Sequence, residues 1–297
     1  MKYYIYVNAF WNGFVNKTDG NHIGFFENLF LHTKLKNFEI TNDINTANVL
    51  FESLFGQSLS TSKKWTYKIH YSGEPYNNNI SNYDVILNSE YDNIKNNIVD
   101  LPLFVYYIHG NNFIERLLSR PLIEKIPCEF CCFIVSNGKC QIRNKMFETL
   151  NKYKKVHSYG KFNNNMNENI KYDYWTDEYF DFIKKYKFII CFENTKKGTY
   201  ITEKIVNSYL TRIIPIYWGT HHVKKIFNNE SMLFLEDENE ESIFKLINRI
   251  IELDNNDEKY LEMINRPIFT NSNLEYFNNH YRIENIALNI DNIISQH

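Results

Sequence analysis

Apolar residues along this chain form short runs that alternate with helical and polar stretches. Lys2–Asn8, Asn48–Leu54 and Phe130–Ser136 are runs of the kind expected for strands, whereas His22–Lys34 carries apolar residues on one helical face. Strands alternating with helices predict an α/β architecture. Further expected elements are strands at Thr66–Ser72, Tyr83–Leu87, Leu103–Tyr107 and Ser231–Leu235, helices at Gln141–Leu150, Glu240–Ile251 and Asn278–Ile294, and loops at Asn77–Asn79 and Asn163–Asn165.

The stretch Lys187–Thr220 contains the densest pattern. An apolar strand at Phe188–Phe192 is followed by a polar loop, by a helix expected over Tyr200–Leu210, and by a second strand at Ile213–Trp218. Polar residues concentrate in the loop between the first strand and the helix. In α/β sheets, ligands bind at loops of this kind, at the carboxyl ends of the strands.

Two cations occupy the first turns of expected helices. Lys204 opposes the positive end of the helix dipole, which favours either a bound anion such as phosphate or an ordinary solvated lysine. Arg143 holds the same kind of position in the helix at Gln141–Leu150, with the same two alternatives. Together, at the carboxyl edge of one sheet, the two cations would clamp a pyrophosphate.

A candidate carboxylate lies on a separate part of the chain. Glu74 directly follows an expected strand end, and Pro75 biases it towards an extended conformation. A carboxylate on a stiff turn is well placed for proton transfer, although a residue of this kind, taken alone, is more often an ordinary surface-turn carboxylate.

Composition narrows the classes of function. The 297 residues suffice for one large domain or two ordinary ones, and 43% hydrophobic content supports a real core. A net charge of −2 argues against a general electrostatic hold on nucleic acid or anionic lipid. We therefore expect no nucleic-acid partner.

Metal and nucleotide motifs of common types do not occur in the sequence. No G-x-x-x-x-G-K-[ST], G-x-G-x-x-G, H-E-x-x-H or Asp-x-Asp is present. Cys128-x-x-Cys131 has no second ligand pair, so we expect the five cysteines to be reduced and mostly buried. If a diphosphate leaves during catalysis, side chains and helix ends must neutralise its charge, and no metal or cofactor is expected.

No targeting segment is visible. The apolar run Tyr3–Val7 is too short for a signal peptide, and no run approaches the roughly 18 residues of a membrane span. We therefore expect a cytoplasmic protein without an integral membrane segment.

The series FENT…YITEK…IPIYWG, read from Phe192 to Gly219, resembles the donor-binding signature of the α1,3/4-fucosyltransferases. Members of that family transfer fucose from GDP-fucose with inversion. The turn at Ser72–Glu74 and the Ser136-Asn137…Arg143 series resemble the same family in register. The resemblance implies a GT-B fold, in which two Rossmann-like domains face each other across a cleft.

The resemblance also implies residue roles. Glu74 would be the general base, while Arg143 and Lys204 would stabilise the departing diphosphate. Glu193 would either bind the donor or orient its loop. The remaining residues implied to bind the donor are Glu203, Asn194, Tyr200, Ser136, Asn137, Tyr159 and Gly160.

The implied partners are GDP-fucose and a glycan acceptor of the galactose or N-acetylglucosamine type, with α1,3 transfer. We expect residues 1–125 to bind the acceptor, 126–275 to bind the donor, and a C-terminal helix within 276–297 to pack back on the first domain. Two alternatives remain open: the same fold with another nucleotide sugar or linkage, and a sugar- or nucleotide-binding protein without turnover. The acceptor and the oligomeric state are not specified by the sequence.

Overall fold

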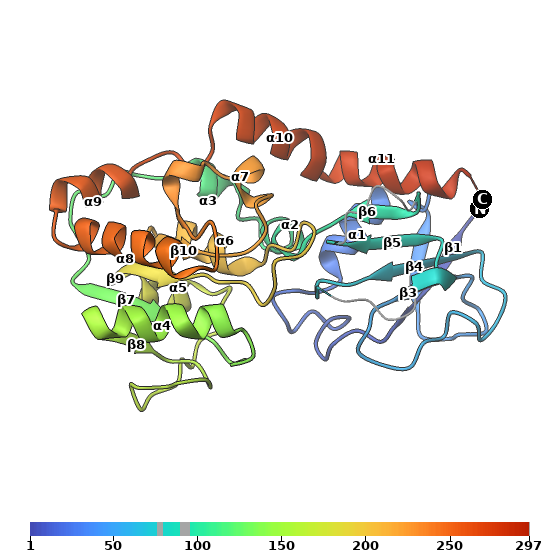
Figure 1. The fold of residues 1–297 in the computed structure, drawn as a ribbon. Helices are drawn as coiled ribbons and strands as arrows, with labels where there is room; N and C mark the ends of the chain where they lie inside the picture. The colour runs from blue at the N-terminus through green and yellow to red at the C-terminus, as the bar shows by residue number, and fades with distance from the viewer. Residues whose placement is uncertain (76–79, 90–95, 297) are drawn as a thin grey trace. The chain divides into compact units, whose positions relative to one another are not determined.

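The chain forms two α/β units, each built on one parallel sheet (Figure 1). A computed structural model describes residues 1–75, 80–89 and 96–296, so the loop expected at Asn77–Asn79 lies outside the described residues. The prediction of two Rossmann-like parts is confirmed. The first unit comprises residues 1–112, 197–200 and 275–297, and the second comprises residues 113–196 and 201–274.

The sheet of the first unit has the strand order β2-β1-β3-β4-β5-β6, with every pairing parallel. Two of its inner strands, β3 and β5, are buried throughout, as expected for a parallel sheet covered on both faces. The elements are β1 (Tyr3–Asn8), α1 (Gly24–Leu31), β2 (Phe38–Thr41), β3 (Val49–Glu52), β4 (Tyr67–Tyr71), η1 (Ile80–Asn82), β5 (Val85–Asn88), β6 (Ile98–Asp100), α2 (Leu103–Gly110) and α11 (Ile283–Ile294).

The sheet of the second unit has the order β11-β10-β9-β7-β8, again parallel throughout. Its strands are β7 (Glu129–Phe133), β8 (Val156–Ser158), β9 (Tyr186–Ile190), β10 (Ile214–Tyr217) and β11 (Leu233–Phe234). Its helices are α3 (Ile114–Leu118), α4 (Gln141–Tyr153), α5 (Asp177–Ile183), α6 (Glu203–Leu210), α7 (Val223–Ile226), η2 (Asn229–Ser231), α8 (Glu240–Asp254) and α9 (Asp257–Ile264); α10 (Asn271–Tyr281) contains the division between the units.

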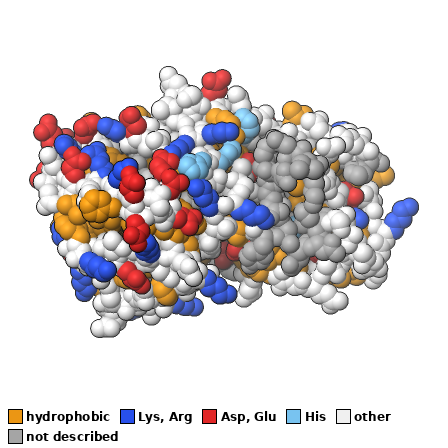
Figure 2. Space-filling view, viewed as in Figure 1, with side chains coloured by type: hydrophobic (Ala, Val, Ile, Leu, Met, Phe, Trp, Pro, Cys, Tyr) orange, Lys and Arg blue, Asp and Glu red, His pale blue; other side chains and the backbone are white. Residues whose placement is uncertain are grey.

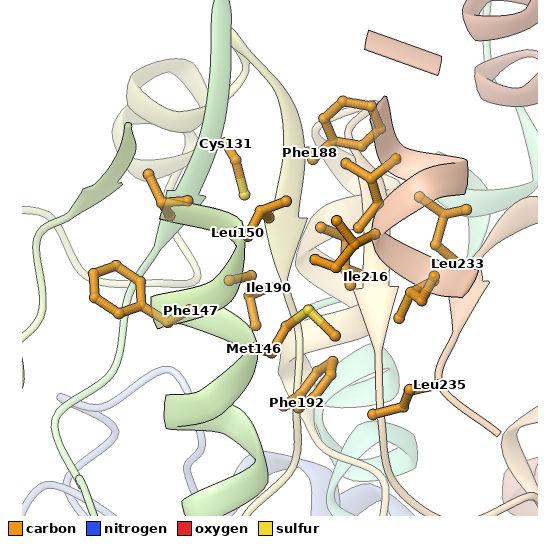
Figure 3. Packing of buried hydrophobic residues seen from close by; sticks show 14 of the residues in the cluster. Cys131, Met146, Phe147, Leu150, Phe188, Ile190, Phe192, Ile216, Leu233 and Leu235 are labelled. Carbon is orange, nitrogen blue, oxygen red and sulfur yellow. The ribbon is translucent and has the colours of Figure 1, made fainter. Parts of the chain in front are cut away.

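One continuous apolar core holds the second unit together. Helix α4 turns Met146 and Leu150 towards the sheet, where they meet Ile190 and Ile216 from the central strands (Figure 3). These four side chains are at most 3% exposed. Burying a side chain of this size stabilises a fold by about 1.5–3 kcal/mol, so this core fixes α4 and the strand ends against each other.

The predicted strand at Leu103–Tyr107 is wrong, because this segment belongs to helix α2. Five consecutive residues, from Phe104 to Ile108, are buried, so the run lacks the polar face that distinguishes a helix from a buried strand. The single C-terminal helix expected over Asn278–Ile294 is instead two helices, separated at Arg282, whose backbone is extended.

Helix α11 packs against α1, β5 and β6 of the first unit. Its buried residues recur on one face, and the backbone N–H of Lys34 donates to Asp291 at 2.8 Å. The C-terminal end of the chain is thereby anchored to the N-terminal sheet.

The surface shown in Figure 2 intersperses acidic and basic side chains over the helices of the second unit. The cysteines form no disulfide; four are buried and Cys128 is exposed. Within residues 1–75, 80–89 and 96–296, no helix has the length and apolar character needed to cross a membrane.

Candidate functional site

The second sheet reverses its winding direction between β7 and β9. The strand that follows β7 in the chain, β8, lies on one side of it, and the next strand, β9, lies on the other. At such a switch point, the loops beyond the carboxyl ends of two neighbouring strands diverge and leave a crevice for a ligand. The predicted donor residues that follow β7 and β9 therefore lie at this switch point.

Arg143 spans the switch point. It lies in the first turn of α4, as predicted, and its side chain is fully buried rather than solvated. Its guanidinium donates to the carbonyl of Asn137 after β7 at 2.5 Å, and to the carbonyl of Phe192 (3.2 Å) and Oδ1 of Asn194 (2.9 Å) after β9. These three acceptors are neutral, and they hold the guanidinium at the carboxyl ends of β7 and β9.

The loops after β7 and β8 are packed backbone to backbone. A Cβ atom on Gly160 would lie 2.0 Å from the carbonyl oxygen of Val135, and one on Gly138 would lie 2.3 Å from the ring of Phe162. Beside the Val135 main chain, which cannot move aside as the Phe162 ring can, only glycine fits at position 160. The main chain of Gly160 is thus held beside the loop that carries Ser136 and Asn137.

Tyr159 is buried, and its hydroxyl shares a 2.8 Å hydrogen bond with the hydroxyl of Tyr186. Tyr186 is the first residue of β9, whereas the ligand crevice lies at the far end of that strand. The phenol of Tyr159 is therefore engaged inside the unit, and its main chain is the part that borders the switch point.

Glu193 is the anchor of the loop that leads into α6. Its buried carboxylate accepts from the backbone N–H of Thr202 at 2.8 Å, from the Thr202 hydroxyl at 2.9 Å and from Nζ of Lys204 at 3.1 Å. Burial raises the pKa of Glu193, and the charge of Lys204 opposes that rise. These contacts support the interpretation that Glu193 orients the loop.

The first turn of α6 differs from the prediction in two ways. The helix begins at Glu203 rather than at Tyr200, because Thr202 adopts the extended backbone of an N-cap residue. Lys204 does lie in the first turn, but its ammonium is paired with Glu193 and lies 4.0 Å from Glu203. A partner inside the protein therefore accounts for much of the unusual placement of this lysine.

The structure brings most of the predicted donor residues to one sheet edge and leaves one elsewhere. Ser136, Asn137 and Asn194 are exposed beyond β7 and β9, and Glu203 is partly buried at the start of α6. Tyr200 is buried and belongs to the first unit, together with residues 197–199. Its contact with a donor stays a prediction.

Glu74 follows β4 of the first unit, as expected. The fully buried Ser72 braces its turn: the Ser72 hydroxyl accepts from the backbone N–H of Glu74 at 3.2 Å and donates to its carbonyl at 3.3 Å. Burial, and then the nearby charge of Glu74, raise the pKa of Tyr71 well above its usual value. Ser72 thus holds the main chain of Glu74, and Glu74 is partly buried.

Two buried polar groups of the first unit were missed by the sequence reasoning. Glu52 accepts from Asn8 and from the backbone N–H of Leu59, each at 2.7 Å, and from the hydroxyl of Tyr83. Asn8 and Glu52 are the last residues of β1 and β3, and each follows an apolar run. A polar residue at the end of a buried strand was therefore the signal in the sequence that could have revealed this pair.

The second missed group is Asp100, the last residue of β6. It accepts from the hydroxyl of Thr199 and, at 2.7 Å, from that of Tyr281. Burial raises its pKa to about 6, and the hydrogen bonds from Thr199 and Tyr281 work against that rise. Asp100 fixes residues 197–200 to the first sheet; nothing in the local sequence signals this contact, because its partners are distant along the chain.

Within the described ranges, no group of three His, Cys, Asp or Glu side chains is arranged to hold a metal ion. The expectation that no metal is required stays a prediction.

A parallel sheet with a buried, charge-bearing arginine at its switch point is typical of domains that bind nucleotides or nucleotide sugars. The family model described as glycosyltransferase family 10 (fucosyltransferase), C-terminal part, matches residues 127–281. The chain belongs to this family, which confirms the resemblance seen in the sequence.

Relatives with assigned names are similar over part of their length. An alpha-(1,3)-fucosyltransferase of Helicobacter pylori is 38% identical over 108 residues, which are 36% of this chain and 21% of the relative. A putative fucosyltransferase of Acanthamoeba polyphaga mimivirus is 26% identical over 192 residues, 62% of this chain and 31% of the relative. The chain thus spans about a fifth to a third of these relatives.

The whole fold matches known structures of the GT-B type. A crystal structure of an alpha1,3-fucosyltransferase with GDP superposes with a TM-score of 0.75 at 22% identity, covering 99% of this chain and 90% of the other. A structure described as the same kind of enzyme with GDP-fucose gives a TM-score of 0.74 with the same coverage. At this level of identity the match establishes the fold.

Proposed function

We propose that this protein is an inverting fucosyltransferase, which moves L-fucose from GDP-fucose to a hydroxyl group of a glycan acceptor. The observation that carries the proposal is Arg143, whose buried guanidinium joins the loops after β7 and β9 at the switch point of the second sheet. Family membership over residues 127–281 supports fucose as the sugar. The Helicobacter pylori relative supports α1,3 transfer. A 4-galactosyl-N-acetylglucosaminide 3-alpha-L-fucosyltransferase of Cricetulus griseus, 28% identical over 130 residues, supports an acceptor of the galactose or N-acetylglucosamine type.

In this proposal the second unit binds the donor. Arg143 stabilises the negative charge that develops on the diphosphate as the bond between the anomeric carbon and the phosphate oxygen breaks. Stabilisation of developing charge by preorganised donors is usually the largest contribution to catalysis. In this proposal the amide of Asn194 and the backbone around Ser136 and Asn137 contact the same group. Lys204, through its pairing with Glu193, holds the start of α6.

The first unit supplies the base. As the acceptor oxygen bonds to the anomeric carbon, its proton passes to the carboxylate of Glu74, and GDP departs with the electron pair of the broken bond. Proton transfer of this kind contributes about 10²–10⁴-fold to rate. The brace from Ser72 supports this role, since a base must be held in a fixed position.

We further propose that the reaction needs neither a metal ion nor a cofactor, because side chains of the second unit supply the positive charge. The test is to incubate the protein with GDP-fucose and a panel of β-galactosides and N-acetyllactosamine, with chelator, and to measure GDP release and the product linkage. Release that depends on an acceptor, with an α1,3 linkage in the product, is the expected result. Tight GDP binding without turnover on any acceptor would favour a binding protein instead.

A further inference from the structure

A cavity of about 280 Å³ lies in the second unit, at the edge of the sheet opposite the switch-point crevice. Arg212 lies on its wall, two residues before the first residue of β10. Because all strands are parallel, this is the amino edge, whereas the donor residues follow the carboxyl ends. The cavity is therefore separate from the proposed donor site.

The wall of this cavity carries arginines and no acidic residue. Arg120, Arg212 and Arg266 line it, and its other lining residues are neutral: Leu117, Leu118, Leu122, Asn265, Pro267, Ile268, Phe269 and Leu274. Arg266 is neutralised by Glu230 at 3.2 Å and Glu262 at 2.6 Å. The other two arginines therefore set the charge of the cavity.

Arg120 forms no hydrogen bond or ion pair within the described part of the chain. Its guanidinium lies over the ring of Tyr209, with 5.7 Å between the guanidinium carbon and the ring centroid. Burial, and then the positive charge of Arg212, lower the pKa of Arg120 to about 10. A partly buried guanidinium with a second one beside it is electrostatically unfavourable unless an anion accompanies them.

Arg212 has one side-chain partner, Oδ1 of Asn265 at 2.8 Å. The same oxygen also accepts from the backbone N–H of Ile123, and Nε of Arg212 has no hydrogen-bond acceptor within the described residues. The negative end of the α6 dipole is adjacent, but a helix end stabilises a cation only modestly. The charge of Arg212 is thus far from balanced.

The backbone conformation of Arg212 independently indicates that its side chain has a role. Its φ of 60° places it in the left-handed region just after α6, where glycine is the usual residue. In this conformation arginine lowers the stability of the fold relative to glycine. The backbone therefore does not account for the presence of arginine at position 212, whereas a binding role of the side chain does.

We propose that this cavity binds a small oxyanion, a phosphate or a phosphate monoester, between the guanidinium groups of Arg120 and Arg212. Guanidinium groups match the geometry of phosphate oxygens, and two of them would chelate one phosphate from two sides. The volume is near the lower end of small-molecule pockets, which span about 300–1,000 Å³, so the ligand is small. The apolar remainder of the wall accommodates a short organic group attached to the phosphate.

The experiment titrates inorganic phosphate into the 297-residue protein by calorimetry at constant ionic strength, using the Arg143→Lys background so that the donor site contributes little. Arg120→Gln and Arg212→Gln are the test variants, and Arg249→Gln, which changes an exposed arginine on α8, is the matched control. We expect phosphate affinity to fall about tenfold or more in both test variants and to remain unchanged in the control. Binding that is the same in all variants, or equally strong acetate binding, would overturn the proposal.

Thermal unfolding in phosphate-free buffer separates a ligand site from a structural role. If Arg120 binds an anion, the Arg120→Gln substitution removes the repulsion between Arg120 and Arg212. The variant then unfolds at the same temperature as the parent or at a higher one. A lower unfolding temperature together with unchanged phosphate affinity would contradict the proposal. Parallel titrations with glycerol 3-phosphate distinguish the sources: tighter binding than inorganic phosphate assigns the site to a monoester, and weaker binding assigns it to free phosphate.

Discussion

The two sheets have the same kind of switch point, but one carries a buried carboxylate there and the other a buried guanidinium. In the first unit the winding reverses between β1 and β3, and the buried carboxylate of Glu52 accepts there from Asn8, Leu59 and Tyr83. In the second unit the reversal lies between β7 and β9, and Arg143 presents a positive charge fixed by neutral acceptors. The strand order thus creates a switch point in each sheet, and the side chains at the strand ends determine which of the two suits an anionic ligand.

The same contrast divides the proposed chemistry. A carboxylate already satisfied by protein donors gains little from a ligand, whereas a buried guanidinium is suited to bind an anion. The first unit is therefore expected to contribute proton transfer through Glu74, and the second to contribute the affinity for GDP.

The largest expected effect is that of Glu74→Gln. The amide keeps the shape of the side chain but cannot accept a proton, so the transfer rate should fall about 10²–10⁴-fold. GDP affinity, which belongs to the second unit, should remain unchanged. Initial rates of GDP release with N-acetyllactosamine, together with GDP titration calorimetry, measure both quantities.

The matched control is Glu39→Gln, an exposed carboxylate on β2 of the same unit, which should leave rate and affinity unaltered. Loss of GDP affinity in the Glu74 variant would show that this residue does not act solely as a base.

Arg143→Lys tests the second switch point. Lysine retains the charge but cannot reach three acceptors on two loops, so we expect GDP affinity to drop about 10–100-fold, the loss of one or two charged hydrogen bonds. Calorimetry with GDP measures this, with Arg249→Lys as the exposed control. Equal affinities for the variant and the parent would mean that the diphosphate binds elsewhere.

Glu193→Gln tests the loop anchor by stability. The amide cannot accept all the hydrogen bonds from Thr202 and Lys204, so the free energy of unfolding should fall by about 1–3 kcal/mol. Urea denaturation measures it. Glu236→Gln, at a carboxylate that is 54% exposed, should change stability by about 0.5 kcal/mol or less; a similar loss in both variants would refute the anchoring role.

The smallest expected effect concerns Asp100 in the first unit. Folding raises its pKa from 3.8 to about 6, so the folded state holds the proton more tightly than the unfolded chain does. The contribution of Asp100 to stability therefore grows as the pH falls from 7 through 6, by about 1 kcal/mol at pH 5. The Asp100→Asn variant should lack this gain in stability, which urea denaturation at pH 7 and at pH 5 measures. If the variant and the parent gained the same stability between these pH values, Asp100 would not be the group responsible.

The spacing of apolar residues along the chain was sufficient to predict the strands and helices that have a regular apolar period. The strand, loop and helix between Phe188 and Leu210, and the first-turn positions of Arg143 and Lys204, follow from apolar spacing. The helix at Leu103–Gly110 was mistaken for a strand because a segment buried on all sides has no polar face to reveal its period.

Pairings between distant residues could not be predicted. That β9 lies beside β7, and so creates the switch point, depends on the whole sheet, and no local signal joins Glu193 to Lys204 or Asp100 to Thr199. The sequence therefore predicted the first-turn positions of Arg143 and Lys204, but not the pairing of Lys204 with Glu193. The donor-binding roles of these residues stay predictions.

The central claim is that GDP binds at the switch point of the second sheet. Hydrogen–deuterium exchange with and without saturating GDP tests it directly, because both crevices are followed in one experiment. Protection should rise in residues 134–140 and 193–196, after β7 and β9, and stay constant in residues 9–13 and 53–57, after β1 and β3. Protection after β1 and β3 instead, or no change after β7 and β9, would contradict the account.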